Sequence, residues 1–329
     1  GDFILDDVSS LRGLPEAEAA GAPHLFDPRP AYRFRHVDSR RLSEPGSRIV
    51  GHNPPYGADV DFYLPEADPH ARLAILGSDG DTIRTLAVDG KAGMNRVWWD
   101  LRGPDGRLPH MLVPPPDAKW VQNNDQGYHL LTGIMVPREV VGPLVVPGDY
   151  TVSLTAGGRT LTAPLTVKAD PHSPGTPESL AAEHAFREKV VGEIDHVASM
   201  IEELEWVRKQ LAAVRMQYGD DPGRAGVVDA ARALADSAIA IEGKLIDVHL
   251  TDGNEDLNRH PSQLYQKLTA LYDKGEADLG PTAAEVAVND EFETWMHRSE
   301  AALKAFRTSD VPAFNRMLEG QGLSVRIEP

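Results

Sequence analysis

The sequence contains no cysteine, which excludes disulfides, thiolate nucleophiles and cysteine-based zinc or iron–sulfur sites. No run of about eighteen apolar residues occurs, so we expect no membrane span. Basic residues are few: 33 Lys and Arg stand against 50 Asp and Glu, which gives a net charge of −17. Because so acidic a chain repels phosphate backbones, we expect no nucleic-acid partner.

Motifs for common enzyme chemistry are also missing. The sequence has no G-x-S-x-G elbow, no P-loop, no G-x-G-x-x-G after a strand and no H-E-x-x-H. Paired carboxylates for glycoside hydrolysis remain an open alternative because acids are abundant, but none stands in a recognisable context. We therefore expect no cofactor and no metal centre, and predict that this chain alone is not an enzyme.

The first fifty residues show little periodicity. Phe3 to Val8 reads as one strand, and the prolines at 15, 23, 28 and 30 favour an extended linker. Such a segment cannot form its own core, so we expect it to lie over later parts of the chain. Since the sequence begins on a strand-like run, we also expect it to be a fragment of a longer protein.

Residues 51–170 read as an all-β domain with short strands and tight turns. Asp79-Gly80 and Gly157-Gly158 supply the turn chemistry of hairpins. Alternation places Trp98 or Trp99 in the core, with Asp100 ending the strand. This pattern predicts an Ig-like or fibronectin-like β-sandwich with a long insertion at 103–147.

The insertion holds the residues that we consider for binding. Its length predicts either a functional loop or one that packs on a neighbouring part of the chain. Trp120 is the candidate for exposed ligand stacking, although packing on the chain's own surface is the commoner role of such a residue. His110 and His129 can meet in space, but two histidines without a third ligand are a weak zinc signal. The candidate binding residues are thus Trp120, His110 and His129.

Residues 171–329 read as an α-helical bundle. Thr176 and Pro177 mark the start of a helix that ends near Gly219, and a second helix follows through Val248. Two long amphipathic helices joined by a short turn predict an antiparallel hairpin. Further helices are expected near 261–273 and 282–306, and a short strand at 323–327. The first helix has an apolar stripe at Ile194, Val197, Ile201, Leu204 and Leu211, and we assign Glu193, Glu202, Glu203 and Arg208 to its solvated face.

Several segments, in order, resemble one family. Gly1–Arg12 resembles the last propeller strand and exit segment of bacterial sortilin-like, BNR/Asp-box β-propeller proteins, which are often labelled glycosyl hydrolase-like. His52–Ala58, Gly93–Arg102 and Val146–Val152 resemble the domain that follows the propeller, which is similar to the Ig-like module of flagellar hook-capping proteins. Leu264–Tyr272, with Ala277-Asp278 and Pro281-Thr282, resembles the helical C-terminus of the same proteins.

The resemblance implies an α+β multidomain chain whose partner is the missing N-terminal β-propeller or another protein chain. It implies a non-catalytic accessory, assembly or binding module in an extracytoplasmic setting, periplasmic or secreted. No Asp-box occurs in this sequence, so no catalytic residue carries over. Two alternatives remain: the C-terminal part or subunit of a sialidase-like BNR glycoside hydrolase, and a carbohydrate-binding module that uses Trp120 on a glycan.

Overall fold

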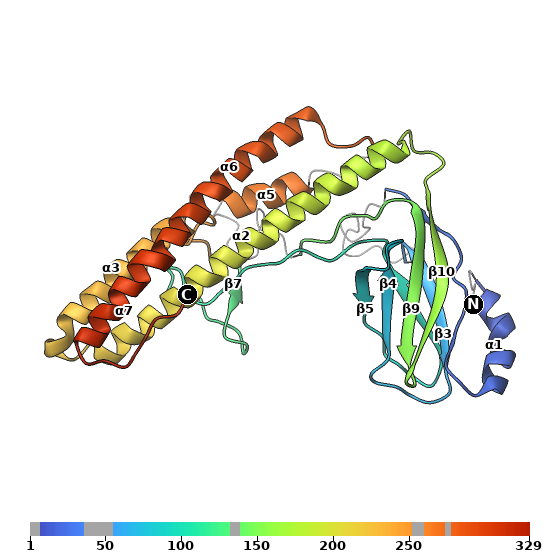
Figure 1. Ribbon diagram of the computed structural model, residues 1–329, viewed down its shortest axis with the longest axis horizontal. Coiled ribbons are helices and arrows are strands. Elements are labelled where there is room, and N and C mark those ends of the chain that lie inside the picture. Colours follow the sequence, from blue (N-terminus) through green and yellow to red (C-terminus); the bar gives the residue numbers. More distant parts are fainter. Residues whose placement is uncertain (1–6, 36–54, 132–138, 252–259, 274–277) are drawn as a thin grey trace, which may run out of the picture. The chain divides into compact units, whose positions relative to one another are not determined.

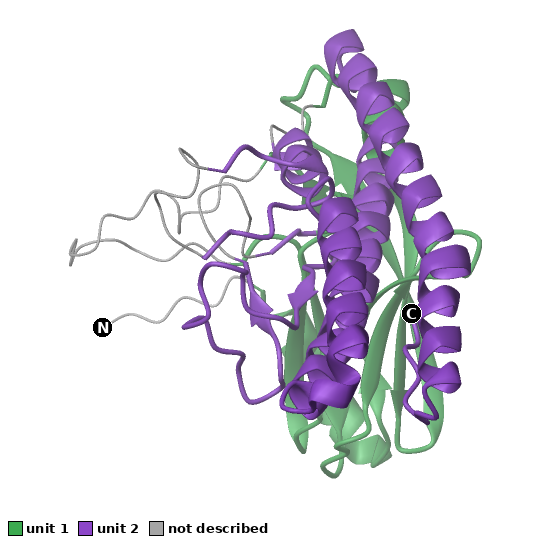
Figure 2. Ribbon diagram, turned by 90° about the vertical axis from the view of Figure 1, so that its left-hand side faces the viewer, with its two compact units in different colours: residues 1–104, 142–185, 276–280 green, residues 105–141, 186–275, 281–329 purple. Residues whose placement is uncertain are grey.

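The computed structural model describes residues 7–35, 55–131, 139–251, 260–273 and 278–329, and it is mixed α and β as expected (Figure 1). The chain forms two compact units (Figure 2). Unit 1 comprises Gly1–Pro104, Gly142–Ala185 and Glu276–Gly280; unit 2 comprises Asp105–Val141, Phe186–Gly275 and Pro281–Pro329. Residues 105–141, expected as an insertion in the β domain, thus belong with the helices.

Unit 1 contains two sheets. The three-stranded sheet has the order β1-β3-β6, from His24–Leu25, Ala58–Leu64 and Gly93–Trp99. The five-stranded sheet has the order β2-β10-β9-β4-β5, from Ala31–Arg33, Arg159–Ala169, Gly148–Ala156, Arg72–Leu76 and Thr82–Leu86. All pairs are antiparallel except β10 with β2.

The glycine turns and the buried tryptophan of this region are confirmed. Gly157 and Gly158 have φ of 55° and 70°, a left-handed pair that a two-residue hairpin requires, and they join β9 to β10. Trp99 ends β6 fully buried, while its indole N–H donates to the Arg102 carbonyl at 2.9 Å. Side chains from both sheets form a single apolar core around it.

The N-terminal segment departs from the expectation. Helix α1 occupies Ser9–Ala20 with Pro15 inside it, so the predicted extended linker is wrong there; the predicted strand lies largely outside the described residues. Contacts of the helix outweigh the tendency of Pro15 to break it: Ala17 is buried, and the Ser10 hydroxyl donates to the Asp61 carboxylate of β3. β1 and β2 pair with later strands, as expected of a segment without its own core.

Helices dominate unit 2. The helical elements are α2 (Pro177–Tyr218, which begins in unit 1), η2 (Pro222–Arg224), α3 (Ala225–Glu242), α5 (Leu264–Asp273), α6 (Ala283–Ala305), the π-helical turn η3 (Phe306–Asp310) and α7 (Val311–Gly320). Two short strands, β7 (His110–Met111) and β8 (His129–Leu130), pair with each other.

Local sequence explains the helix starts. The Thr176 hydroxyl accepts from the Ser179 amide at 3.2 Å, which caps α2 as predicted. Thr282 and Glu285 form a capping box at α6. The predicted strand at 323–327 is wrong: the Ile327 amide and carbonyl bond to the Asn315 side chain, each at 2.8 Å, instead of to another strand. Helix α7, which carries Asn315, was not predicted.

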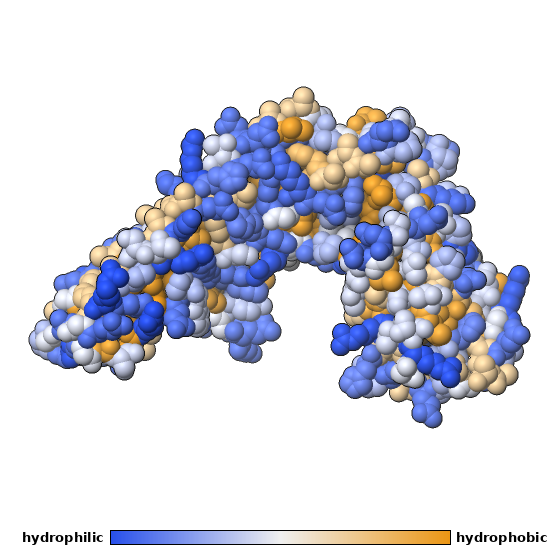
Figure 3. Space-filling view, viewed as in Figure 1, coloured by the Kyte–Doolittle hydropathy of each residue, from blue (hydrophilic) through white to orange (hydrophobic). Residues whose placement is uncertain are grey.

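Hydrophilic residues cover most of the face drawn in Figure 3, with hydrophobic residues in small separate patches. Within the described ranges, no helix combines the length and the apolar character needed to cross a bilayer.

Candidate functional site

The segment from 105 to 131 is the most unusual feature of unit 2, because carboxylates of α2 hold its backbone. The Arg107 amide donates to Asp195 at 2.6 Å, and its guanidinium donates to Glu202 at 2.5 Å. The His110 amide also donates to Glu202, at 3.2 Å. The predicted loop is therefore packed on a neighbouring helix through its main chain.

A buried charge network continues this attachment. Glu205, fully buried on α2, accepts from the amides of Leu112 and Val113 at 2.5 and 2.7 Å. The Arg208 guanidinium donates to both Glu205 and Glu242, the latter at 2.7 Å. Two carboxylates thus share one guanidinium inside the helical unit.

With both carboxylates ionised, the network would have one negative charge more than positive charges. Burial, with a contribution from the Glu205 charge, raises the pKa of Glu242 well above its usual range, and Arg208 only partly offsets this. Burial also lowers the pKa of His129, which favours the neutral form of its ring. Glu205 binds both the main chain of the loop and Arg208, and Arg208 binds Glu242, so this network anchors the loop to α2.

The two candidate histidines do not form a common site. In the β7–β8 pair His110 lies opposite Leu130, and Met111 lies opposite His129, so the two imidazoles project from opposite faces. His110 Nδ1 lies 3.0 Å from Glu202, whereas His129 Nδ1 lies 2.8 Å from the side-chain oxygen Oδ1 of Asn123. Across the described parts of the chain, no cluster of three or more side chains suits a metal ion.

Trp120 lies in the open part of the loop. Its side chain is 74% exposed, although the loop around it is well anchored. Ala118 is buried, and the Asn123 amide nitrogen donates to the carbonyls of Leu112 and Gly127 at 3.0 and 2.9 Å. His249 Nδ1 also lies 3.0 Å from the Asp117 carboxylate. An exposed indole on a braced loop is suited to contact a partner surface.

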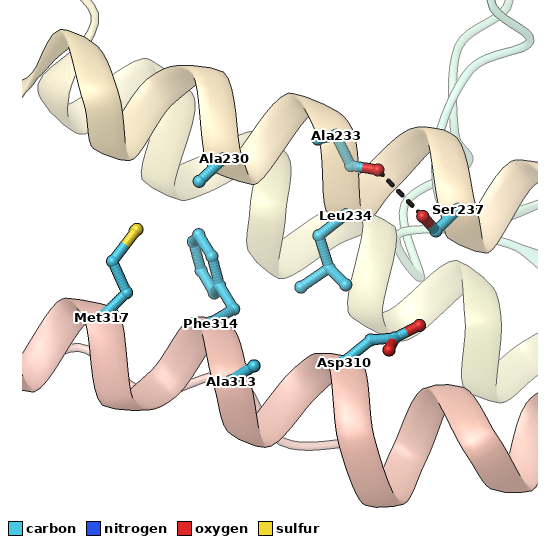
Figure 4. Close-up of a pocket in the computed structure, with 8 residues that line it drawn as sticks. All are labelled: Ala230, Ala233, Leu234, Ser237, Asp310, Ala313, Phe314 and Met317. Atoms are coloured by element: carbon cyan, nitrogen blue, oxygen red, sulfur yellow. Dashed lines mark hydrogen bonds between the residues drawn. The ribbon is translucent and has the colours of Figure 1, made fainter.

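A second surface feature lies between α3 and α7. The open groove of about 330 Å³ is lined mainly by small and apolar side chains: Ala230, Ala233, Leu234, Ser237, Asp310, Ala313, Phe314 and Met317 (Figure 4). The Ser237 hydroxyl donates to the Ala233 carbonyl at 3.1 Å. Asp310 is the single ionisable residue in the lining. The groove therefore provides no acid–base pair.

Sequence reasoning missed the anchoring role of Glu205 and misassigned two charges. Glu193 and Arg208, expected on a solvated face, are 7% and 5% exposed. A detectable signal was that Glu205 and Arg208 lie one turn apart beside the apolar stripe, where a charge pair can enter the interior. The sequence gives no sign of which main-chain amides Glu205 binds.

The chain matches none of the family models with which it was compared, and no curated protein matches it.

Proposed function

We propose that this chain is a non-catalytic accessory or assembly module, and that Trp120 on the braced loop is its main partner contact. The parent is an extracytoplasmic, sortilin-like β-propeller protein, and the partner is that propeller or another protein chain. The observation that carries the proposal is the 74% exposure of a tryptophan whose loop is held at Leu112 and Val113 by the buried carboxylate of Glu205. Exposed tryptophans are enriched among residues that dominate protein interfaces.

The finer architecture belongs to the same proposal. Unit 1 is an Ig-like or fibronectin-like sandwich, and α2 with α3 is an antiparallel hairpin. Two sheets with a common core support the first assignment, as does the Tyr150 hydroxyl, which donates to the Val146 carbonyl at 2.6 Å in the manner of a tyrosine corner. The short η2 turn between α2 and α3 supports the second.

The first test is the sequence upstream of residue 1 in the intact gene. The proposal requires Asp-box repeats and a signal peptide there. If they are present, that upstream part is produced separately, and its binding to this chain is measured by calorimetry.

The binding experiment includes Trp120→Ala and the matched variant Trp206→Ala, whose indole on α2 is 46% exposed. We expect Trp120→Ala to weaken binding by about tenfold or more and Trp206→Ala to change it little. Equal effects of both variants, or no binding by the unaltered chain, would contradict the assignment.

A glycan partner is the second candidate, because an exposed indole also stacks on sugar rings. The test is a glycan array with the same two variants: glycan binding that only Trp120→Ala abolishes favours a carbohydrate-binding module over protein assembly.

The hydrolase alternative predicts turnover. Aryl glycosides are offered to the chain alone, and hydrolysis that one Asp or Glu substitution abolishes would overturn the non-catalytic proposal.

A further inference from the structure

Glu193 on α2 and Asn289 on α6 form an incomplete buried pair. Glu193 is 7% exposed and Asn289 is fully buried. The Asn289 amide nitrogen donates to Glu193 Oε1 at 3.1 Å. The remaining oxygens, Glu193 Oε2 and Asn289 Oδ1, are both buried, and neither has a hydrogen-bond partner among the described residues. An ionised carboxylate and an amide oxygen are both acceptors, so this pair lacks one donor.

A single proton on Glu193 supplies that donor. A carboxylic acid and a primary amide each present one donor beside one acceptor, so they can join through two hydrogen bonds in a ring. We propose that Glu193 and Asn289 form such an acid–amide ring, in which the Glu193 hydroxyl donates to Asn289 Oδ1. Two hydrogen bonds then join α2 to α6 while Glu193 is protonated, and one remains after it ionises. The pair is therefore a pH-dependent link between α2 and α6 inside unit 2, which we call the latch.

The charges around the pair place the switch near neutral pH. Burial raises the pKa of Glu193 to about 7; the Asn289 hydrogen bond and Lys189 act in the opposite direction, and the neighbouring Glu293 adds to the rise. Lys189 Nζ lies 4.0 Å from Glu193 Oε1 and 3.0 Å from Glu293 Oε1, and Asp290 also interacts with Lys189. The ammonium is therefore held mainly by Glu293, which leaves Glu193 without a full counter-charge.

The latch predicts how the stability of unit 2 depends on pH. Because the folded state raises the pKa of this carboxyl, it binds the proton more tightly than the unfolded state does. The stabilisation is complete below the ordinary value of 4.5, declines as the pH rises through about 7, and changes little above that. This inference is independent of the proposed partner contact.

The direct test is carboxyl NMR on the full chain with ¹³C-labelled glutamate. The Glu193 signal is assigned by its loss in Glu193→Gln. We expect it to titrate near pH 7, while the amide hydrogens of α6 around Asn289 exchange faster as it ionises. Titration near 4.5 would overturn the proposal.

Glu193→Gln also tests the ring by stability. Its amide reproduces both hydrogen bonds without a titrating proton, so the denaturation midpoint should lose its Glu193-dependent fall between about pH 5 and 8. Glu291→Gln, at an exposed position of α6, should keep that fall.

Glu293→Gln tests whether the proton of Glu193 is donated to Asn289 Oδ1 or shared with the Glu293 carboxylate. If the ring is correct, Glu193 in this variant still titrates well above the ordinary glutamate value, because burial is the main cause. Because Glu293→Gln also frees Lys189 to pair with Glu193, the decisive variant is Glu193→Gln: an unchanged pH slope there would show that the acid–amide ring does not form.

Discussion

The two units have different interiors. The core of unit 1 is apolar, and its buried charges are few: Arg33, Asp61 and Glu183. Unit 2 has more of them, at Arg187, Glu193, Glu205, Arg208 and Glu242. In a sheet the strand ladders satisfy the backbone, and alternation sends polar side chains outward. Helix α2 is contacted on several sides within unit 2, so some of its charged positions face other elements and must be paired there.

Arg187 should show the largest effect, because its side chain is buried and ties two helices to α2. Its guanidinium donates to the carbonyls of Leu271 and Tyr272 at the end of α5, at 3.0 and 2.9 Å, and to Glu285 of α6 at 3.1 Å. Arg187→Leu leaves those carbonyls without this donor, so we expect a loss of about 3–5 kcal/mol in unfolding free energy. Urea melts measure it, and Arg215→Leu at an exposed position is the control.

The apolar core of unit 2 gives the next effect. Leu204 is fully buried on the predicted stripe, so Leu204→Ala removes contacts and leaves a cavity. We expect a cost of about 2–5 kcal/mol in the same melts. A cost near zero would mean that the buried face of α2 is assigned wrongly.

In unit 1 the buried charged residue to compare with Arg187 is Asp61. It accepts from Arg96 Nε and Nη2, both at 2.7 Å, and from the Ser10 hydroxyl of α1. Asp61→Asn weakens these bonds, but Arg96 is 30% exposed and stays solvated, so we expect only about 1–3 kcal/mol. Hydrogen exchange in α1 should accelerate in this variant; unchanged exchange there would contradict the role of Asp61 in holding the helix.

The buried carboxyl of Glu242 should make the stability of unit 2 depend on pH. Since the folded state raises its pKa, its ionisation destabilises unit 2 as the pH rises from 4.5 toward the folded value. Glu242→Gln should therefore make stability less dependent on pH between about 5 and 8, with the gain over the unaltered chain largest at the alkaline end. Denaturant midpoints across that range measure it. A larger pH dependence in the variant would show that the sign is wrong.

Much of the local structure was predictable because it depends on residues close in sequence. The caps at Thr176 and Thr282, the Gly157-Gly158 turn and the burial of Trp99 follow from short-range rules. Helix α1 was not predictable by the same rules, since they treat Pro15 as a breaker, and contacts with β3 outweigh it.

The candidate site was predictable only in part. The length of the insertion indicated a functional or docked loop, and Trp120 could be singled out by type. The acceptors that hold the loop lie about ninety residues away on α2, as in the bond from the Leu112 amide to Glu205. No spacing rule encodes a contact between a carboxylate and a distant main-chain amide. For the same reason, the charges at Glu193 and Arg208 looked solvated in the sequence.

Glu203 should show the smallest effect and so define the surface of unit 2. It pairs with both Arg307 Nε and Nη2, at 2.8 and 2.5 Å, but Arg307 is 48% exposed. A substitution on a solvated face costs below about 0.5 kcal/mol as a rule. The two-point geometry raises our expectation to at most about 1 kcal/mol, because exposed pairs are weakened by water and side-chain entropy. A double-mutant cycle with Arg307→Ala isolates the pair, and its coupling should largely vanish at about 1 M salt, where screening acts within about 3 Å. The cost of Leu204→Ala should persist there. A coupling that survives salt would place Glu203 with the buried charges of α2.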